Sequence, residues 1–246
     1  MGAATLSGDE VAVLERDTVA AVAPPEILEI GGWLVPLDAG TIGRAKSAVP
    51  LRHDIGAEAI GEIVAAYRSR GLPPAFRIAD VPGLDAVREA LARLGFSGQQ
   101  PTVFKLGSVT ELAAFSTQSA RILDRPDAAW AAVFLGEGFD PADGAHRVAA
   151  LTRSPGALYA AAGADGLTHA VGVMSFGARW AGIHGMRTAP AHRGQGYASA
   201  ILGELGRAAR ARGATDVFLQ VEEPNPARRI YRRAGFSPVW TYRYWR

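Results

Sequence analysis

The chain has 246 residues, of which 48% are hydrophobic and 20% are charged, a balance typical of a globular protein of one long or two small domains. It contains no cysteine, which excludes disulfides, thiolate metal sites and a cysteine nucleophile, and we assign no metal ligands. No apolar run approaches the length that crosses a membrane, and the mixed, acidic stretch 1–25 does not fit a signal peptide. These features predict a cytoplasmic enzyme or binding protein.

The net charge of +2 is unevenly distributed along the chain. From Arg187 onward there are eleven arginines and four acidic residues, whereas the whole chain has two lysines. An arginine-rich segment suits a polyanion, such as a phosphorylated cofactor, a nucleic acid or an acidic surface. It equally suits a solvated face, so a motif has to decide between these interpretations.

In the first half, hydrophobic periodicity and turn residues predict alternating helices and strands. The expected helices are Glu10–Ala21, Ala57–Arg70 and Leu84–Leu94, and the expected strands are Ile27–Leu37, Arg44–Val49, Phe76–Ala79 and Thr102–Leu106. Ser, Thr and Gln cluster between Leu106 and Ala120, which predicts a joint between two parts of the chain.

The second half continues in the same manner. The expected helices are Asp127–Leu135, Asp143–Thr152, Tyr197–Arg212 and Pro226–Ala234, and the expected strands are Leu158–Ala162, His169–Phe176, Trp180–Thr188, Asp216–Val221 and Val239–Tyr244. The first three of these strands follow one another closely enough to form a meander. The pattern predicts an α/β fold with a mixed sheet.

The two halves of the chain resemble each other. The stretch LARLGFS at 91–97 is similar to YRRAGFS at 231–237, which lies 140 positions later, and AVP at 48–50 matches TAP at 188–190 at the same offset. A third match pairs YRSRGLPPAFRI at 67–78 with ARARGATDVFLQ at 209–220. Three matches in the same order predict a tandem duplication, with domains at 1–112 and 113–246.

A glycine-rich basic loop precedes the helix that is expected from Tyr197. Its pattern is Arg193-x-x-Gly196-x-Ala198, with a further glycine at Gly194. A helix start leaves backbone N–H groups without partners, and glycines let these amides approach a bulky anion. The loop therefore fits a phosphate or pyrophosphate. It matches neither a P-loop nor the dinucleotide fingerprint.

A second motif, NPARRIYRRAGF, spans 225–236. Asn225 is a plausible N-cap, and the following proline fits the first helical position. Tyr231 lies on the same helix face as the apolar residues of the motif, so it points to the interior or to a cleft. It could also be a core tyrosine whose hydroxyl bonds a neighbour.

Together the two motifs resemble the GNAT superfamily of acyl-CoA N-acyltransferases, over roughly Leu158–Arg246. The resemblance implies acetyl-CoA as the co-substrate and Tyr231 as the general acid that protonates the leaving thiolate. It also implies backbone hydrogen bonds from the strand before the loop to the pantetheine arm, and contact of Asn225 with that arm. The implied pantetheine residues are Met186, Arg187 and Thr188, and the implied pyrophosphate residues are Arg193, Gly194, Gln195, Gly196, Tyr197 and Ala198.

The chemistry of such a transfer is consistent with these residues. A thiolate leaving group has a pKa of about 8.5 and a tyrosine one of about 10, so the phenol can supply the proton. An amine that attacks the thioester directly needs no nucleophile from the enzyme, but it must be neutral. Candidates for the base are His184, Glu222 and Glu223, although His184 also fits a satisfied strand histidine and the glutamates fit a solvated loop.

The first half lacks the corresponding chemistry. At an offset of 140 the loop becomes His53-x-x-Gly56-x-Glu58, whose carboxylate would repel phosphate, and Tyr231 becomes Leu91. We expect this half to bind no acyl-CoA and to brace the active half or to form a wall of its acceptor pocket. It resembles the degenerate leading domain of tandem GNAT proteins.

The acceptor is poorly specified by the sequence. Trp130, Phe134, Phe139 and Trp180 precede or flank the central strands and could line its pocket, although such residues are more often core. We expect a small-molecule amine, with no membrane and no nucleic acid as partner. Two alternatives stay open: a module that senses acyl-CoA without turnover, and a nucleic-acid binder that uses the arginines of 226–234.

Overall fold

The structure is a computed structural model that describes residues 6–138 and 140–246. The helices are α1 Gly8–Ala20, α2 Ile60–Arg68, α3 Asp85–Arg93, α4 Val109–Ala114, α5 Ala128–Leu135, α6 Pro141–Leu151, α7 Tyr197–Ala211 and α8 Arg228–Arg233, with short 3-10 helices η1 Gly43–Ala45, η2 Pro82–Leu84 and η3 Pro190–His192. The strands are β1 Glu26–Ile30, β2 Trp33–Leu37, β3 Val49–Pro50, β4 Phe76–Ala79, β5 Gly98–Ser108, β6 Arg121–Leu123, β7 Leu158–Ala162, β8 Ala170–Phe176, β9 Ala181–Thr188, β10 Asp216–Glu222 and β11 Ser237–Trp245.

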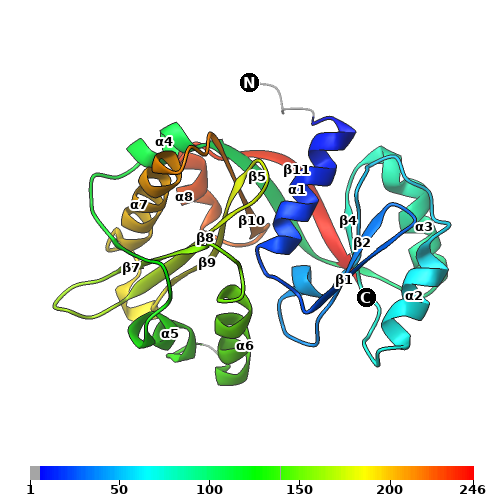
Figure 1. Ribbon diagram of the computed structural model, residues 1–246, viewed down its shortest axis with the longest axis horizontal. Helices are drawn as coiled ribbons and strands as arrows, with labels where there is room; N and C mark the ends of the chain where they lie inside the picture. The colour runs from blue at the N-terminus through cyan, green and yellow to red at the C-terminus, as the bar shows by residue number, and fades with distance from the viewer. Residues whose placement is uncertain (1–5, 139) are drawn as a thin grey trace.

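A mixed eight-stranded sheet runs through both halves of the molecule, in the order β4-β11-β5-β10-β9-β8-β7-β6 (Figure 1). Strands β6 to β9 form an antiparallel meander, and β10 is parallel to β9. A second sheet of three strands, β1-β2-β3, belongs to the first half. The expected α/β fold with a mixed sheet is confirmed.

The two halves exchange strands at the centre of the large sheet. Strand β5 of the first half pairs with β10, strand β11 of the second half pairs with β4, and β5 and β11 pair with each other. In the ladder between β5 and β11, Thr102 lies opposite Tyr242, its counterpart at the offset of 140. Because the halves share this ladder, the division into domains at residue 112 stays a prediction.

Three expected elements differ from the structure. The expected strand Ile27–Leu37 is a hairpin, because Gly31 and Gly32 adopt positive φ angles of 54° and 81° and turn the chain back on itself. The expected strand Arg44–Val49 is replaced by η1, in which the Ser47 hydroxyl donates to the Gly43 carbonyl at 2.8 Å, and by the short β3. The expected joint Leu106–Ala120 contains helix α4.

Helices cover both faces of the second half of the sheet. Helices α4 and α7 pack together on one face, and α5 and α6 pack on the other (Figure 1). Ala200, Ile201 and Leu205 of α7 are buried in the core against the meander, which fixes the start of this helix beside the end of β9. Among residues 6–138 and 140–246, no helix combines the length and apolarity that spanning a bilayer requires.

Candidate active site

A long cleft opens where β9 and β10 part. The two strands pair from Ala181 to Ile183, opposite Val217 to Leu219, and the pairing stops there. The remaining residues of β9, from His184 to Thr188, therefore lack a strand partner on this side. The cleft between the separated ends measures about 880 Å³ and reaches the start of α7. An extended ligand could add its amide groups to such an open strand edge.

A β-bulge shapes the strand at the head of this cleft. The register between β8 and β9 shifts between Val171 and Val173, and Gly185 takes a φ of 55°. Gly185 and Met186 both line the cleft. A bulge of this kind re-aims the backbone next to a site. The partly buried Met186, Arg187 and Thr188, which the sequence assigns to the pantetheine arm, all line the cleft.

The basic loop closes the other end of the cleft. Gly194 has a φ of 80° and Gly196 a φ of 88°, and Gly196 is the N-cap of the 15-residue helix α7. No side chain accepts a hydrogen bond from the first turn of this described helix, so its amides remain available to a ligand. All six residues assigned to the pyrophosphate, from Arg193 to Ala198, line the cleft, and Arg193 is exposed. The loop thus offers amides, a helix dipole and a cation to an anion.

Tyr231 stands on α8 where the cleft meets a second cavity. It is buried, at 8% exposure, and it lines both cavities. Burial raises the pKa of its phenol to about 12, so the hydroxyl keeps its proton at neutral pH. Asn225 lines both cavities as well, but it is not the expected N-cap: α8 begins at Arg228 with Ala227 as its N-cap, and the side-chain oxygen of Asn225 accepts from the Ala227 amide at 2.9 Å in the turn before the helix.

The second cavity, which we call the polar pocket, measures about 420 Å³ and is built by both halves of the chain. Its walls in the first half are Thr41–Arg44 of the η1 segment together with Gln100 and Thr102 of β5. Its walls in the second half include β9, β10, Tyr231 and the β11 residues Tyr242 and Tyr244. Six residues line the polar pocket and the cleft alike: Arg147, Gly185, Met186, Glu222, Asn225 and Tyr231. The two cavities are therefore adjacent.

Glu222 and Glu223 occupy different environments. Glu222 ends β10, lines both cavities and accepts a hydrogen bond at 2.7 Å from the side-chain amide of Gln100, whose φ is 55°. Glu223 is exposed and is absent from the residues that line either cavity, and its backbone amide donates to the Pro101 carbonyl at 2.8 Å. Both glutamates are exposed, but Glu222 is the one that lines the two cavities lined by Tyr231.

His184 lies in the wall of the polar pocket with both ring nitrogens engaged. Arg44 Nη1 lies 3.0 Å from its Nδ1, and the Ser175 hydroxyl lies 2.9 Å from its Nε2. Since a guanidinium can only donate, Nδ1 accepts and Nε2 carries the proton. Burial, with Arg44 beside it, holds the pKa of His184 well below its usual value. This geometry is that of a satisfied strand histidine.

The aromatic residues expected around the acceptor lie elsewhere. Trp130 and Trp180 are buried in the core, at 0% and 3% exposure, and Phe134 lines the long cleft. Phe139 lies outside the described residues. The polar pocket instead contains residues that the sequence did not single out, namely Arg44, Gln100, Thr102, Arg147, Tyr242 and Tyr244. The repeat could have indicated Arg44, which is the counterpart of His184.

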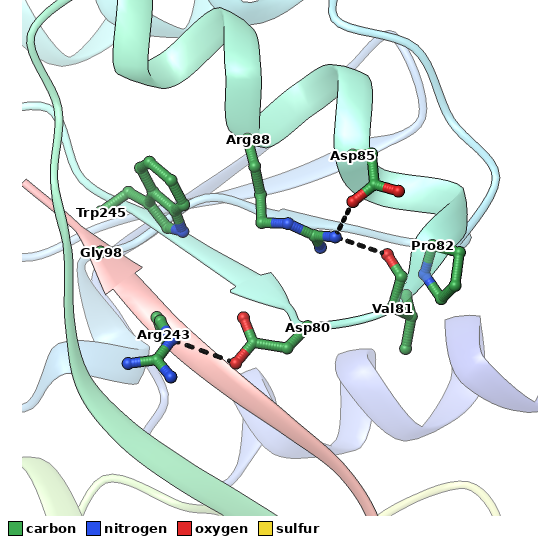
Figure 2. Close-up of a pocket in the computed structure, with 8 residues that line it drawn as sticks. All are labelled: Asp80, Val81, Pro82, Asp85, Arg88, Gly98, Arg243 and Trp245. Carbon is green, nitrogen blue, oxygen red and sulfur yellow. Dashed lines mark hydrogen bonds and ion pairs between the residues drawn. The ribbon is translucent and has the colours of Figure 1, made fainter.

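A third cavity, of about 620 Å³, lies between residues 80–98 of the first half and Arg243 and Trp245 of β11, and it shares no lining residue with the long cleft or the polar pocket (Figure 2). Arg88 donates to the Val81 carbonyl and pairs with Asp85, and Arg243 pairs with Asp80 at 3.1 Å. The charged groups of this cavity thus neutralise one another. It offers no uncompensated charge to a ligand.

The separated strands, the bulge and the glycine loop before α7 define the class of protein. The chain is a GNAT-type N-acetyltransferase, and such enzymes generally use acetyl-CoA. The family model described as "Probable histone acetyltransferase Rv0428c C-terminal" matches residues 9–245, and the chain belongs to this family.

Individual relatives cover nearly the whole chain. The uncharacterized N-acetyltransferase YobR of Bacillus subtilis (strain 168) is 26% identical over 248 residues, which include 96% of this chain and 98% of that protein. A GCN5-related N-acetyltransferase from Kribbella flavida has a TM-score of 0.70 at 16% identity, covering 96% of this chain and 94% of its own. A tandem GNAT protein from the clavulanic acid biosynthesis pathway has a TM-score of 0.59 at 15% identity, covering 98% and 96%.

Proposed function

We propose that the protein transfers the acetyl group of acetyl-CoA to a primary amine of a small molecule by direct attack in a ternary complex. The observation that carries this proposal is the junction of the long cleft with the polar pocket at Tyr231 and Glu222. The cleft has the size and the anion-binding end that acetyl-CoA needs. The pocket is lined largely by polar residues and opens at the same point, where an amine could meet the thioester.

The residues at this junction can be given roles. Glu222 takes a proton from the attacking ammonium, directly or through water, and Gln100 holds its carboxylate in place at 2.7 Å. The neutral amine nitrogen then bonds to the acetyl carbon while the bond from carbon to sulfur breaks, and the nitrogen releases its second proton to solvent, from which Tyr231 is reprotonated after the transfer. Tyr231 donates its proton to the leaving thiolate, and its buried phenol is kept neutral for this task. Because its ring nitrogens are already engaged, His184 fits a positioning role better than that of the base.

The binding loop provides the test. Gly194 and Gly213 both have a φ of 80°, and a Cβ at either would meet nothing within 4 Å. Gly194 lines the cleft and Gly213 follows α7 at its far end. Calorimetric titration with acetyl-CoA should show one site per chain, with affinity reduced at least about 10-fold in Gly194→Glu and unchanged in Gly213→Glu. Absence of binding to the wild type, or equal loss in both variants, would refute the proposal.

The alternative of a non-catalytic acyl-CoA sensor predicts the same binding without turnover. Release of CoA in the presence of an amine panel separates the two possibilities. The alternative of a nucleic-acid binder that uses the arginines of 226–234 receives less support, because Arg228 of this segment and Arg207 of α7 are engaged within the protein. Arg207 bonds three backbone carbonyls and Glu204, and Arg228 bonds the Glu223 carbonyl.

A further inference from the structure

The guanidinium of Arg44 differs from those of Arg77 and Arg147 in lacking an acidic partner among the described residues. Arg77, buried nearby, pairs with Glu15 at 2.6 Å, and Arg147 pairs with Asp143 at 2.7 Å. Arg44 donates from Nη1 to His184, and among the described residues no carboxylate lies within ion-pair distance of it. A guanidinium does not give up its charge in a protein, so a half-buried arginine without a counterion calls for an anion from outside.

The surroundings of Arg44 hold it toward the polar pocket. The Nδ1 atom of His184, which accepts from Arg44 Nη1, is held in place by the other side of the ring. The Nε2 proton of His184 is directed to the Ser175 hydroxyl, and this hydroxyl lies 3.4 Å from the Gly182 carbonyl. Gly43 packs against the ring of Tyr244, where a Cβ would come within 2.6 Å. Arg44 lines the pocket, and its Nε and Nη2 make no hydrogen bond within the part of the chain that the structure describes. These donors are those of a preorganised fork for an oxyanion.

The charge of the pocket is asymmetric. Its lining contains Arg44, Arg246 and the Asp143-paired Arg147, with Glu222 as the acidic side chain among the described lining residues. Glu222 belongs to the boundary with the long cleft, whereas Arg44 lies on the wall from the first half and does not line the cleft. Burial is the main cause that lowers the pKa of Arg44; Tyr242 and Tyr244 oppose this effect, and the nearby Arg77 and Arg147 add to it. Arg44 and Arg246 thus line the polar pocket alone and have no ion pair among the described residues, whereas Glu222 and the Asp143-paired Arg147 lie at the junction with the cleft.

We propose that the acceptor is an amine that also carries an anionic group, a carboxylate or a phosphate, and that Arg44 binds this group while the amine faces Glu222 and Tyr231. This inference rests on the proposed function. A lysine-rich polypeptide would bring further positive charge to the arginines of the pocket and is the acceptor that this arrangement disfavours.

The first experiment measures turnover with matched acceptors. β-Alanine is compared with β-alaninamide, and aminoethyl phosphate with ethanolamine, so that each pair differs in the anion alone and the two pairs distinguish carboxylate from phosphate. CoA release by the wild type should favour the anionic member of at least one pair by about 10- to 100-fold in kcat/KM. Arg44→Gln should lose this preference through KM, Arg44→Lys should retain part of it, and Arg93→Gln, on the exposed face of α3, should retain all of it.

The second experiment needs no turnover. N-Acetyl-β-alanine and its amide are titrated calorimetrically into the wild type and Arg44→Gln, each first shown to unfold cooperatively. If N-acetyl-β-alanine binds more tightly than its amide to the wild type but not to Arg44→Gln, the anion site is supported. If acetyl-CoA does not bind in the same protein, that result refutes the proposed function and leaves the anion site supported. Equal turnover of both members of each pair with equal binding of both products, or faster acetylation of a lysine-rich peptide, would overturn the inference.

Discussion

The side chains of Arg44 in η1 and His184 in β9, which are 140 positions apart in the sequence, meet at 3.0 Å in the wall of the polar pocket. The contact therefore joins two residues separated by the offset of the internal sequence repeat. The contact also explains the state of the histidine, since its Nδ1 accepts from a permanent cation. A second proton on this ring would have to break that hydrogen bond.

This contact predicts a loss of stability in mild acid. The pKa of His184 is held well below 6.5 in the folded protein by burial and by Arg44, whereas an unfolded histidine binds its proton near about 6.5. Below that pH the unfolded chain takes up the extra proton, so the free energy of unfolding falls by about 1.4 kcal/mol per pH unit until the folded pKa is reached. Burial also lowers the pKa of His53, which adds to the slope in the same direction. Urea unfolding at pH 7 and pH 5 measures the loss in the free energy of unfolding. If His184→Gln loses as much stability between these pH values as the wild type, His184 is not the cause of the pH dependence.

Replacing Tyr231 with phenylalanine should lower kcat by about 100-fold while acetyl-CoA affinity changes little, because the ring remains and the proton donor is lost. Since burial raises the pKa of this phenol to about 12, its ionisation should cause no decline of the wild-type rate between pH 8 and 10. Steady-state kinetics over this pH range and calorimetry on Tyr231→Phe check both parts. A variant with unchanged kcat would remove the tyrosine from the mechanism.

Glu222→Gln and Glu223→Gln form a matched pair of neighbouring substitutions. Only the first removes a carboxylate that lines the two cavities. We expect Glu222→Gln to lower kcat/KM for the amine by about 100-fold and to change the shape of the pH–rate profile, and Glu223→Gln to leave both as in the wild type. Similar profiles for all three proteins would show that the base is another group or water.

The buried Asp17 of α1 connects the first half to the turn between β8 and β9. Its carboxylate accepts from the Ala178 amide at 2.9 Å and from the Trp180 amide at 3.3 Å. In Asp17→Asn one side-chain oxygen becomes a donor facing another donor, so we expect a loss of about 1–3 kcal/mol in the free energy of unfolding. Asp9→Asn, at the exposed start of the same helix, should cost about 0.5 kcal/mol. Equilibrium denaturation of both variants tests the difference.

The sequence predicted the parts of the site that lie in local motifs. The loop from Arg193 to Ala198 and the helix with Tyr231 do line the long cleft, because each is a short segment whose pattern fixes its own conformation. Their roles in binding and catalysis stay predictions. The sequence predicted that the first half braces the active half or forms a wall of the acceptor pocket, but it did not single out Arg44 and Gln100, which reach the polar pocket from that half. Arg44 was placed in a strand, and nothing in its neighbours indicated the 3-10 turn that redirects its side chain.

For the fold as well, the sequence predicted the local elements but not how the strands pair across the sheet. Local periodicity located most helices and strands, including β4, β7 and α7, within a few residues of their observed bounds. Pairing across the sheet depends on contacts between residues more than 100 positions apart, such as Thr102 with Tyr242, and these have no local pattern. The repeat indicated two similar halves, but not that each contributes a strand to the other.

The exchange of β5 and β11 also affects how the protein emerges from the ribosome. Strand β11 lies between β4 and β5 in the sheet. The first half therefore cannot complete its strand pairing until residues 237–245 have been synthesised. Until then, β4 and β5 present unpaired backbone edges that can bind other chains. The nascent first half should therefore depend on chaperones, and sheet closure should be a late step of folding in which both halves are completed together.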